Sequence, residues 1–299
     1  AWQCSRNPPD VDAALAVYRA WCQENQGIKE STILVRCHFI ARFLLIVRRR
    51  VRDSSRGRPT VDDIDEFVAE CKAIGPASIA GACTALRSFL RFQYETGRTA
   101  TDMSLLVGTV RPNIVRPPRS IPWKDVRGVL GAIDRRRPVG KRDYAMVLLM
   151  ASYGLGRAEV AALSLNDIDW HQGTLRVVRE KNGLEFILPL LDSVAEAIAS
   201  YLRYGRPPST ARRVFLRTTA PYTPLAAGSI SALVRRHAAE IGVKASPHTL
   251  RHSYACRHIE INTPPKCITD ILGHKDPQSI STYVRVAHNR LRQLCLPLP

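Results

Sequence analysis

Residues 171–190 read HQGTLRVVREKNGLEFILPL. Two runs in this stretch, 174–178 and 185–188, are rich in the β-branched and apolar residues that strands favour. Lys181, Asn182 and Gly183 lie between the runs, and Asn-Gly in that position is a strong signal for a β-hairpin. We therefore expect a small antiparallel sheet here, with Lys181 at its tip.

The sequence on both sides of this hairpin has a helical pattern. Residues 31–51 place Ile33, Cys37, Ile40, Leu44 and Val47 at alternating spacings of four and three, which is one apolar stripe along a helix. Similar patterns predict helices at 11–22, 61–74, 77–96, 123–134, 141–153, 192–204, 229–241, 248–261, 265–272 and 287–294, and a short helix after a turn at 154–156. The predicted fold class is mainly α with one small antiparallel β-sheet.

Composition divides the chain into two parts. Residues 108–120 are rich in proline and arginine and have no apolar periodicity, so we interpret them as a linker. We predict a helical N-terminal domain at 1–107 and an α+β domain at 121–299 that ends in a C-terminal tail. The chain has 299 residues, 45% of them hydrophobic, which is enough for a core in each domain.

The charge of the chain indicates a polyanionic partner. Lys and Arg number 44 against 26 Asp and Glu, a formal net charge of +18. A surface this basic attracts polyanions, and the excess of Arg over Lys favours bidentate phosphate recognition, so we expect double-stranded DNA as the partner. No apolar run reaches the roughly 18–20 residues that span a bilayer, and the first residues lack a signal-peptide pattern. We therefore predict a cytoplasmic protein with no membrane partner.

The eight cysteines, at positions 4, 22, 37, 71, 83, 256, 267 and 295, form no Cys-x-x-Cys pair. Most of them fall on apolar helix positions. We interpret them as reduced thiols in the core, and we expect no metal and no other cofactor.

Side chains suited to phosphate chemistry gather in the second half of the chain. The motif HTLR sets His248 and Arg251 three residues apart on one helix face. The motif LGH ends at His274, and Tyr283 follows nine residues later. Each feature alone has an ordinary interpretation: a charged helix surface, a core tyrosine, or a solvated turn for Lys181.

Taken together and in this order, the motifs resemble the tyrosine recombinase (phage integrase) family. The matching stretches are HTLRHSYA, ILGHKD and STYVRV, with REKNG at the hairpin, and the likeness covers residues 121–287. The resemblance implies that the second domain is the family's α+β catalytic domain. It also implies that the N-terminal domain, which contains LRSFLRFQYETGR, is the helical core-binding domain that contacts DNA.

The resemblance implies a covalent mechanism at a phosphodiester. Tyr283 is the implied nucleophile, and its attack on phosphorus would give a phosphotyrosine that keeps the energy of the broken bond. Arg251 and Arg157 are the implied clamps of the non-bridging oxygens, because guanidinium groups are always charged and bind such oxygens in pairs.

Three further residues complete the implied catalytic set. Lys181 is the implied general acid for the leaving oxygen. His248 is the implied base or hydrogen-bond donor toward the phosphate, and His274 is implied to position the transition state. The resulting enzyme needs neither a metal nor ATP.

One motif departs from the family pattern. Family members read Gly-Leu-Arg, two residues, then Glu, whereas residues 153–160 here read YGLGRAEV. Gly156 therefore stands where the arginine is expected, and Arg157 follows one position late. On a regular helix that shift turns the side chain by about 100°. A glycine at the start of a helix can instead adopt unusual backbone angles and re-aim Arg157, so both outcomes stay open.

Arginines outside the motifs are the predicted DNA contacts. Arg87 and Arg91 share one face of the 77–96 helix, for which a solvated charged face is the alternative. Arg111, Arg116 and Arg119 lie in the linker and suggest that two basic domains close around a duplex.

The implied function is site-specific DNA recombination or integration through a covalent 3'-phosphotyrosine intermediate. The resemblance also implies a tetramer on DNA, held by the C-terminal tail at 289–296, with sister recombinases as a further class of partner. Residues 154–170 resemble recombinases encoded by bacterial transposable elements. Two alternatives remain open: a type IB topoisomerase-like enzyme, and a catalytically silent DNA-binding accessory recombinase.

Overall fold

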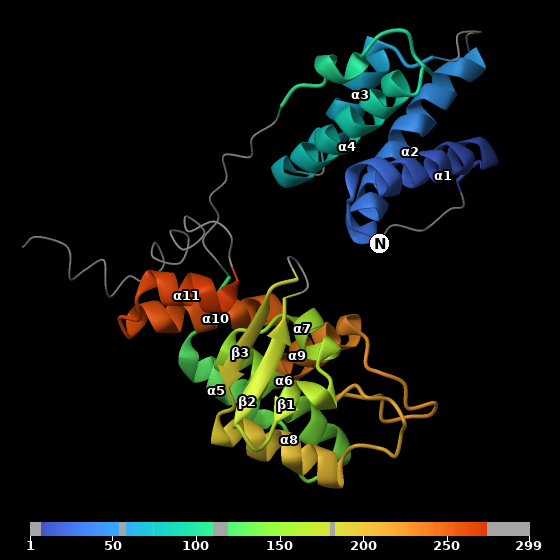
Figure 1. Ribbon diagram of the computed structural model, residues 1–299. Helices are drawn as coiled ribbons and strands as arrows, with labels where there is room; N and C mark the ends of the chain where they lie inside the picture. Colours follow the sequence, from blue (N-terminus) through green and yellow to red (C-terminus); the bar gives the residue numbers. More distant parts are fainter. Residues whose placement is uncertain (1–6, 54–57, 74, 110–118, 180–182, 274–299) are drawn as a thin grey trace, which may run out of the picture. The chain divides into compact units, whose positions relative to one another are not determined.

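The computed structural model describes residues 7–53, 58–73, 75–109, 119–179 and 183–273 of the chain. The chain forms two compact units, Ala1–Ile114 and Val115–Pro299 (Figure 1). The division between the units falls inside the predicted linker at 108–120. Each unit has a hydrophobic core of its own.

The first unit is helical throughout its described residues. Aromatic rings fill its core, where Tyr18, Phe67, Phe89 and Phe92 are almost completely buried. The rings meet edge to face, as in the pair of Tyr18 and Phe89 with centroids 5.6 Å apart, an arrangement that the ring quadrupoles favour. Its elements are α1 (Pro9–Gln26), α2 (Glu30–Asp53), α3 (Val61–Lys72), α4 (Pro76–Glu95) and the short 3-10 helix η1 (Met103–Leu106).

The second unit combines helices with a small sheet. Its elements are α5 (Trp123–Ala132), α6 (Pro138–Tyr153), α7 (Arg157–Ala162), η2 (Leu165–Asp167), β1 (Ile168–Asp169), β2 (Thr174–Val178), β3 (Glu185–Pro189), α8 (Asp192–Tyr204), α9 (Ala227–Glu240), α10 (Pro247–Glu260) and α11 (Pro265–Leu272).

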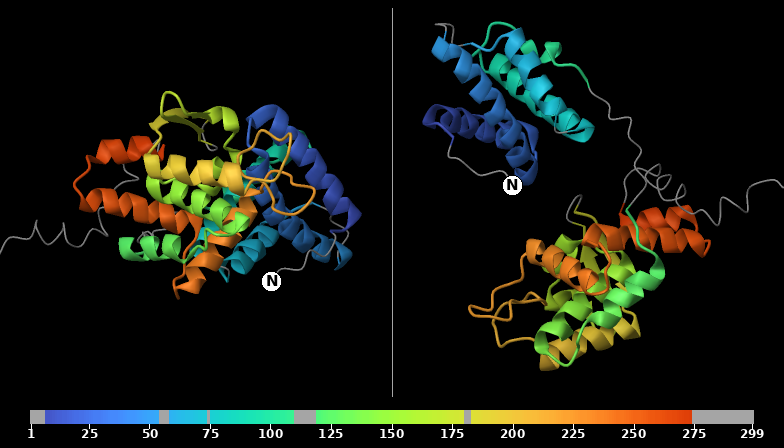
Figure 2. Two further views of the ribbon diagram at one scale, coloured as in Figure 1. Left: turned by 90° about the horizontal axis from the view of Figure 1, so that it is seen from below. Right: turned by 180° about the vertical axis from the view of Figure 1, so that it is seen from behind.

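Helix α6 is the centre of this unit. It is apolar on nearly every side, with a run of buried residues at 145–151, so it packs as an interior helix. It contacts both α8 and α10. Helices α10 and α11 pack together at the end of the unit opposite α8 (Figures 1 and 2).

The sheet has the antiparallel strand order β1-β2-β3. Leu175 pairs with Leu188 and Val177 with Phe186. Leu175 and Val177 are buried, whereas Ile187 on the other face is 74% exposed, so one face packs on the core. The hairpin end of β2 is tied by the bonds from Arg179 N to Leu184 O and from Gly183 N to Arg179 O, both 2.8 Å long.

The entry of the chain into the second unit is attached to α10. The Ile121 N–H donates to Ser253 Oγ at 2.8 Å, and the Ser253 hydroxyl donates to the Ile121 carbonyl at 2.9 Å. Ser253 is 2% exposed. These two bonds satisfy its hydroxyl, which would otherwise be buried without a partner.

The predicted fold class is confirmed: the described chain is mainly α with one small antiparallel sheet. The predicted strand at 174–178 and the helices at 192–204 and 265–272 have the observed bounds, and the other described helices agree to within a few residues. The short strand β1 was not predicted. The predicted helix at 287–294 lies outside the described residues.

The cysteines divide by position. Cys22, Cys37, Cys71 and Cys83 are buried as predicted, and burial raises the pKa of Cys37 to about 11. Cys267 is exposed, so the prediction of a core position is wrong for this residue. Cys4 and Cys295 lie outside the described residues. Within the described ranges, no helix is at once long enough and apolar enough to cross a membrane.

Candidate active site

Helix α10 positions two of the predicted site residues. Ser246 caps the helix, since its Oγ accepts a hydrogen bond from Thr249 N at 3.2 Å, and Pro247 occupies the first turn. His248 and Arg251 follow within the first turns of α10. Their spacing of three residues places both on one side of the helix.

Arg251 joins three segments of the unit. Its Nη1 donates to the Gly154 carbonyl at 2.9 Å and lies 3.6 Å from Glu159 Oε2, and its Nη2 donates to the Leu272 carbonyl. The side chain is 15% exposed. Arg251 thus links the end of α6, the start of α7 and the end of α11 while its charge still faces a cavity.

The turn before α7 has its left-handed residue at Gly154, with φ +61°. A Cβ at this position would come within 2.8 Å of Tyr254 Cδ1, so the site needs glycine for two reasons. Gly156 has φ −79° and ψ 161°, angles that any residue adopts. The hypothesis that an unusual backbone at Gly156 re-aims Arg157 is therefore wrong.

Glu159 caps the start of α7. Its Oε2 accepts a hydrogen bond from Gly156 N at 2.6 Å, three residues before it. Helix α7 accordingly begins at Arg157. A Cβ added at Gly156 would lie 3.4 Å from Glu159 Oε2, an ordinary contact.

Arg157, His248 and Arg251 line one cavity of about 540 Å³. Arg157 Nη1 donates to Ser231 Oγ on α9 at 3.0 Å, and Ser231 is itself buried. Arg235, one turn further along α9, lines the same cavity. The structure thus brings Arg157 to the same cavity as Arg251, by way of α9 rather than through an altered turn.

His248 is neutral in this environment at neutral pH. Burial lowers its pKa below the ordinary value of 6.5, and the nearby charge of Arg251 lowers it further. The ring of His252 lies 4.0 Å away, centroid to centroid, and packs against it edge to face. A neutral imidazole offers one donor and one acceptor to a ligand in the cavity.

Arg179, which the sequence analysis did not single out, lies buried behind this cavity. It follows β2 and is 2% exposed. Its Nη1 donates to Glu159 Oε2 at 2.7 Å, and its Nη2 donates to the Ile271 carbonyl. Its guanidinium also lies 5.3 Å from the ring centroid of Phe186. The alternation that buries Leu175 and Val177 gives position 179 the same face, and this is the sequence signal that could have found it.

Three of the predicted site residues lie outside the described residues: Lys181, His274 and Tyr283. Described residues flank Lys181 on both sides and His274 on one side. Arg179 and Gly183 close the hairpin around Lys181, and Gly273 immediately precedes His274. Their roles stay predictions.

The predicted DNA contacts have different surroundings. Arg87 Nη1 donates to Thr109 Oγ1 at 2.8 Å, and Arg91 Nε lies 3.4 Å from Glu95 Oε1. Both line a cavity of about 450 Å³ in the first unit. Arg119 is exposed. Arg111 and Arg116 lie outside the described residues.

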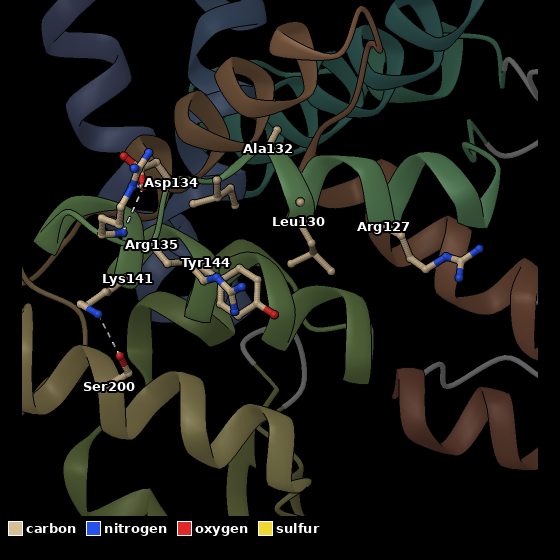
Figure 3. Close-up of a pocket in the computed structure, with 11 residues that line it drawn as sticks. Arg127, Leu130, Ala132, Asp134, Arg135, Lys141, Tyr144 and Ser200 are labelled. Atoms are coloured by element: carbon tan, nitrogen blue, oxygen red, sulfur yellow. Dashed lines mark hydrogen bonds and ion pairs between the residues drawn. The ribbon is translucent and has the colours of Figure 1, made fainter.

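A separate cavity of about 950 Å³ lies beside α5 and α6 and contains none of the predicted site residues (Figure 3). The guanidinium of Arg135 covers the ring of Tyr144 at 4.6 Å, and Lys141 Nζ donates to Ser200 Oγ at 3.3 Å. Arg127 extends away from Tyr144 in this view. Arg135 and Lys141 are thus engaged with the wall itself. Across the described residues, no group of three or more His, Cys, Asp or Glu side chains is arranged to hold a metal ion.

Comparison with known proteins identifies the family of this chain. Residues 120–290 match the model of the phage integrase family. The chain belongs to this family. It is 33% identical, over 99% of its length and 73% of the relative's, to the integrase/recombinase y4rA of Sinorhizobium fredii (strain NBRC 101917 / NGR234). It is 29% identical to the tyrosine recombinase XerD of Ralstonia nicotianae (strain ATCC BAA-1114 / GMI1000), over 78% of this chain and 77% of XerD.

Solved structures of a site-specific recombinase and of an integrase share the fold. A post-cleavage complex of the XerH site-specific recombinase with a palindromic difH substrate has a TM-score of 0.71 at 14% identity, covering 98% of this chain and 97% of that one. A lambda integrase tetramer bound to a Holliday junction has a TM-score of 0.67 at 18% identity, covering 91% of this chain and 76% of that one. At these identities the likeness concerns the fold.

Proposed function

We propose that this chain is a site-specific DNA recombinase that cleaves and rejoins DNA through Tyr283. The proposal rests on one observation: Arg157, His248 and Arg251 line a single cavity, and Arg251 bonds the Leu272 carbonyl at the start of the LGH motif. Two guanidinium groups and an imidazole at one cavity suit a bound phosphodiester. Membership of the phage integrase family supports the same conclusion.

The proposed chemistry is a phosphoryl transfer in two reversible steps. The Tyr283 hydroxyl attacks phosphorus and the 5' oxygen leaves, which gives a 3'-phosphotyrosine and a free 5' hydroxyl. Arg157 and Arg251 stabilise the charge that develops on the non-bridging oxygens. Attack by the 5' hydroxyl of another strand then releases the tyrosine and rejoins the DNA, so the step needs neither ATP nor a metal.

Proton transfer and orientation fall to the remaining residues. Lys181 is proposed to protonate the leaving 5' oxygen. The neutral ring of His248 donates a hydrogen bond to the phosphate or accepts a proton, and His274 positions the transition state. The lowered pKa of His248 supports the neutral form at neutral pH.

The proposed partners are double-stranded DNA and further copies of this chain. The structural relatives include a lambda integrase tetramer on a Holliday junction, which supports self-association on DNA. We propose that the helical domain, residues 1–107, and the catalytic domain, residues 121–299, both contact the duplex. The tail at 289–296 is proposed to hold the tetramer, with sister recombinases as further partners. A cytoplasmic location and a bacterial transposable element as the source fit this proposal.

The two alternatives are weaker. The family match and the recombinase relatives favour recombination over a topoisomerase-like activity. A silent accessory protein would bind DNA without forming a covalent bond, and experiment can separate it from an active recombinase.

The test is the capture of a covalent adduct. Duplexes bound by the Tyr283→Phe variant are selected from a random-sequence library, and each recovered duplex is then nicked near the bound site so that cleavage cannot be reversed. Wild-type protein should form an adduct that survives denaturation, with the DNA on Tyr283 by mass spectrometry of the peptide. Tyr283→Phe should bind the same duplexes and form none. Binding by wild-type protein without an adduct would identify the silent accessory protein instead.

A further inference from the structure

Among the described residues behind the cavity, one buried carboxylate lies near two guanidinium groups. Glu159 Oε2 lies 2.7 Å from Arg179 Nη1 and 3.6 Å from Arg251 Nη1. One carboxylate therefore faces two guanidinium groups. The side chains of Arg179 and Glu159 are 3% and 10% exposed, so water screens their attraction little.

The two arginines have different access to a ligand. Arg251 lines the cavity, whereas Arg179 does not. Arg179 is the nearer partner of Glu159 and takes the larger share of its charge. Without Arg179, the Glu159 carboxylate would pair with Arg251 alone. The negative charge of Glu159 would then largely cancel the positive field of Arg251 toward the cavity.

Arg179 also fixes the position of three segments. It follows β2 two residues before Lys181, it bonds Glu159 of α7, and it bonds the Ile271 carbonyl at the end of α11. Its side chain packs against Gly273, where a Cβ would meet Arg179 Cγ at 3.2 Å. The segments that lead to Lys181 and His274 thus meet at one guanidinium.

We infer that Arg179 is a positioning residue of this recombinase: by neutralising Glu159 it leaves the charge of Arg251 available to the phosphate, and by bonding the Ile271 carbonyl it fixes the end of α11, where the LGH motif begins. The inference rests on the proposed function. It assigns to Arg179 no contact with DNA.

The test begins with single-turnover cleavage of the nicked duplexes recovered above. Arg179→Met keeps the length of the side chain but removes its charge, so Glu159 pairs with Arg251 instead. Cleavage should therefore slow on the order of 10²-fold, the scale for a displaced catalytic group. Affinity for the same duplex should hardly change, since contacts to many phosphates determine it. Arg176→Met on the same strand is the matched control: Arg176 is exposed on the other face of the sheet and pairs with Asp167 and Glu185, and cleavage should be unchanged.

A second change separates charge balance from simple loss of structure. Adding Glu159→Gln to Arg179→Met removes the carboxylate that would otherwise pair with Arg251, so most of the lost cleavage should return. Arg179→Lys should fall between Arg179→Met and wild type. Thermal unfolding of the same variants is the second measurement. Arg179→Met should lower Tm, and the double variant should regain most of the lost Tm. Wild-type cleavage by Arg179→Met, or no recovery of either rate or Tm in the double variant, would overturn the inference.

The two proposals fail in different ways. If wild-type protein forms no adduct, the recombinase proposal fails and, with it, the catalytic part of this inference. The Tm cycle then decides whether Arg179 and Glu159 are coupled. If wild type cleaves and Arg179→Met cleaves equally well, the recombinase proposal stands and the positioning role alone is refuted.

Discussion

Arg157 and Arg251 reach the same cavity from different helices, and this predicts equal effects of their removal. Arg157→Ala and Arg251→Ala should each slow single-turnover cleavage on the order of 10²- to 10³-fold, because each deletes one donor to the developing charge. Ser231→Ala, which removes the hydroxyl that Arg157 bonds, should have a smaller effect in the same direction.

Gly156→Arg decides whether Arg157 replaces the arginine of the family pattern. Position 156 has ordinary backbone angles, so the variant should fold. It should restore cleavage to Arg157→Ala and add little to wild type, since the clamp is already present. A fully active Arg157→Ala, together with a large gain from Gly156→Arg alone, would show that Arg157 has no part in the site.

The lowered pKa of His248 predicts a stability that depends on pH. The unfolded chain takes up a proton near pH 6.5, whereas the folded chain resists it, so stability is full above that pH and is lost as the pH falls through the lower folded pKa. His258 has a pKa shifted in the same direction by burial and Arg257. Urea unfolding is measured between pH 7.5 and 5, from about one unit above to about 1.5 units below the ordinary histidine pKa. His248→Gln and His258→Gln should each flatten the loss of stability, and His171→Gln, at an exposed position, should not. An unchanged slope in His248→Gln would contradict the pKa shift.

Among single residues, those within a local motif were predictable from the sequence, and ion pairs between distant residues were not. The HTLR spacing correctly placed His248 and Arg251 together, because both lie on one helix. The pairing of Glu159 with Arg179 joins residues 20 positions apart in different elements, and no spacing rule specifies it. The interior position of Arg179 was nevertheless detectable, since it continues the buried alternation of β2.

The turn between α6 and α7 depends on Gly154. A residue with a side chain there costs about 1–2 kcal/mol for the left-handed conformation alone, and contact with Tyr254 and Leu272 adds to that. Gly154→Ala should therefore lower the free energy of unfolding measured in urea, and it should also slow cleavage, because Arg251 bonds the Gly154 carbonyl.

The matched control for that change is Gly131→Ala. Gly131 lies in α5, and a Cβ there would meet no atom within 4 Å. Alanine in a helix is favoured over glycine by roughly 0.5–1 kcal/mol, so this variant should be as stable as wild type or more so. Equal losses in both variants would show that the turn at Gly154 has no special requirement.

Elements with many periodic residues were predictable from the sequence, and short ones were not. The apolar stripe of α2 extends over about four turns, and the strand pattern at 174–178 is bounded by a turn signal, so both were found. Strand β1 has only two residues, Ile168 and Asp169, too few to show any period. Its pairing with β2 comes from the tertiary contact rather than from its own sequence.

The net charge of +18 predicts that DNA binding weakens steeply with salt. Each phosphate contact contributes a slope of about −0.9 to the dependence of log affinity on log salt concentration. The double variant Arg87→Ala/Arg91→Ala should reduce that slope by roughly one to two. Arg49→Ala is the control, because Arg49 lies on α2, outside the cavity that Arg87 and Arg91 line. A flat dependence on salt for wild type would contradict a clamp around the duplex.

The two bonds between Ile121 and Ser253 determine where the second unit can be cut from the chain. A fragment that starts at Trp123, where α5 begins, lacks Ile121. The buried Ser253 hydroxyl would then lose both partners, in the middle of the helix that carries His248 and Arg251. A fragment that starts at Arg119 or earlier keeps both bonds. The N-terminal limit of a stable catalytic fragment is therefore set by Ser253, a residue more than a hundred positions downstream of the cut.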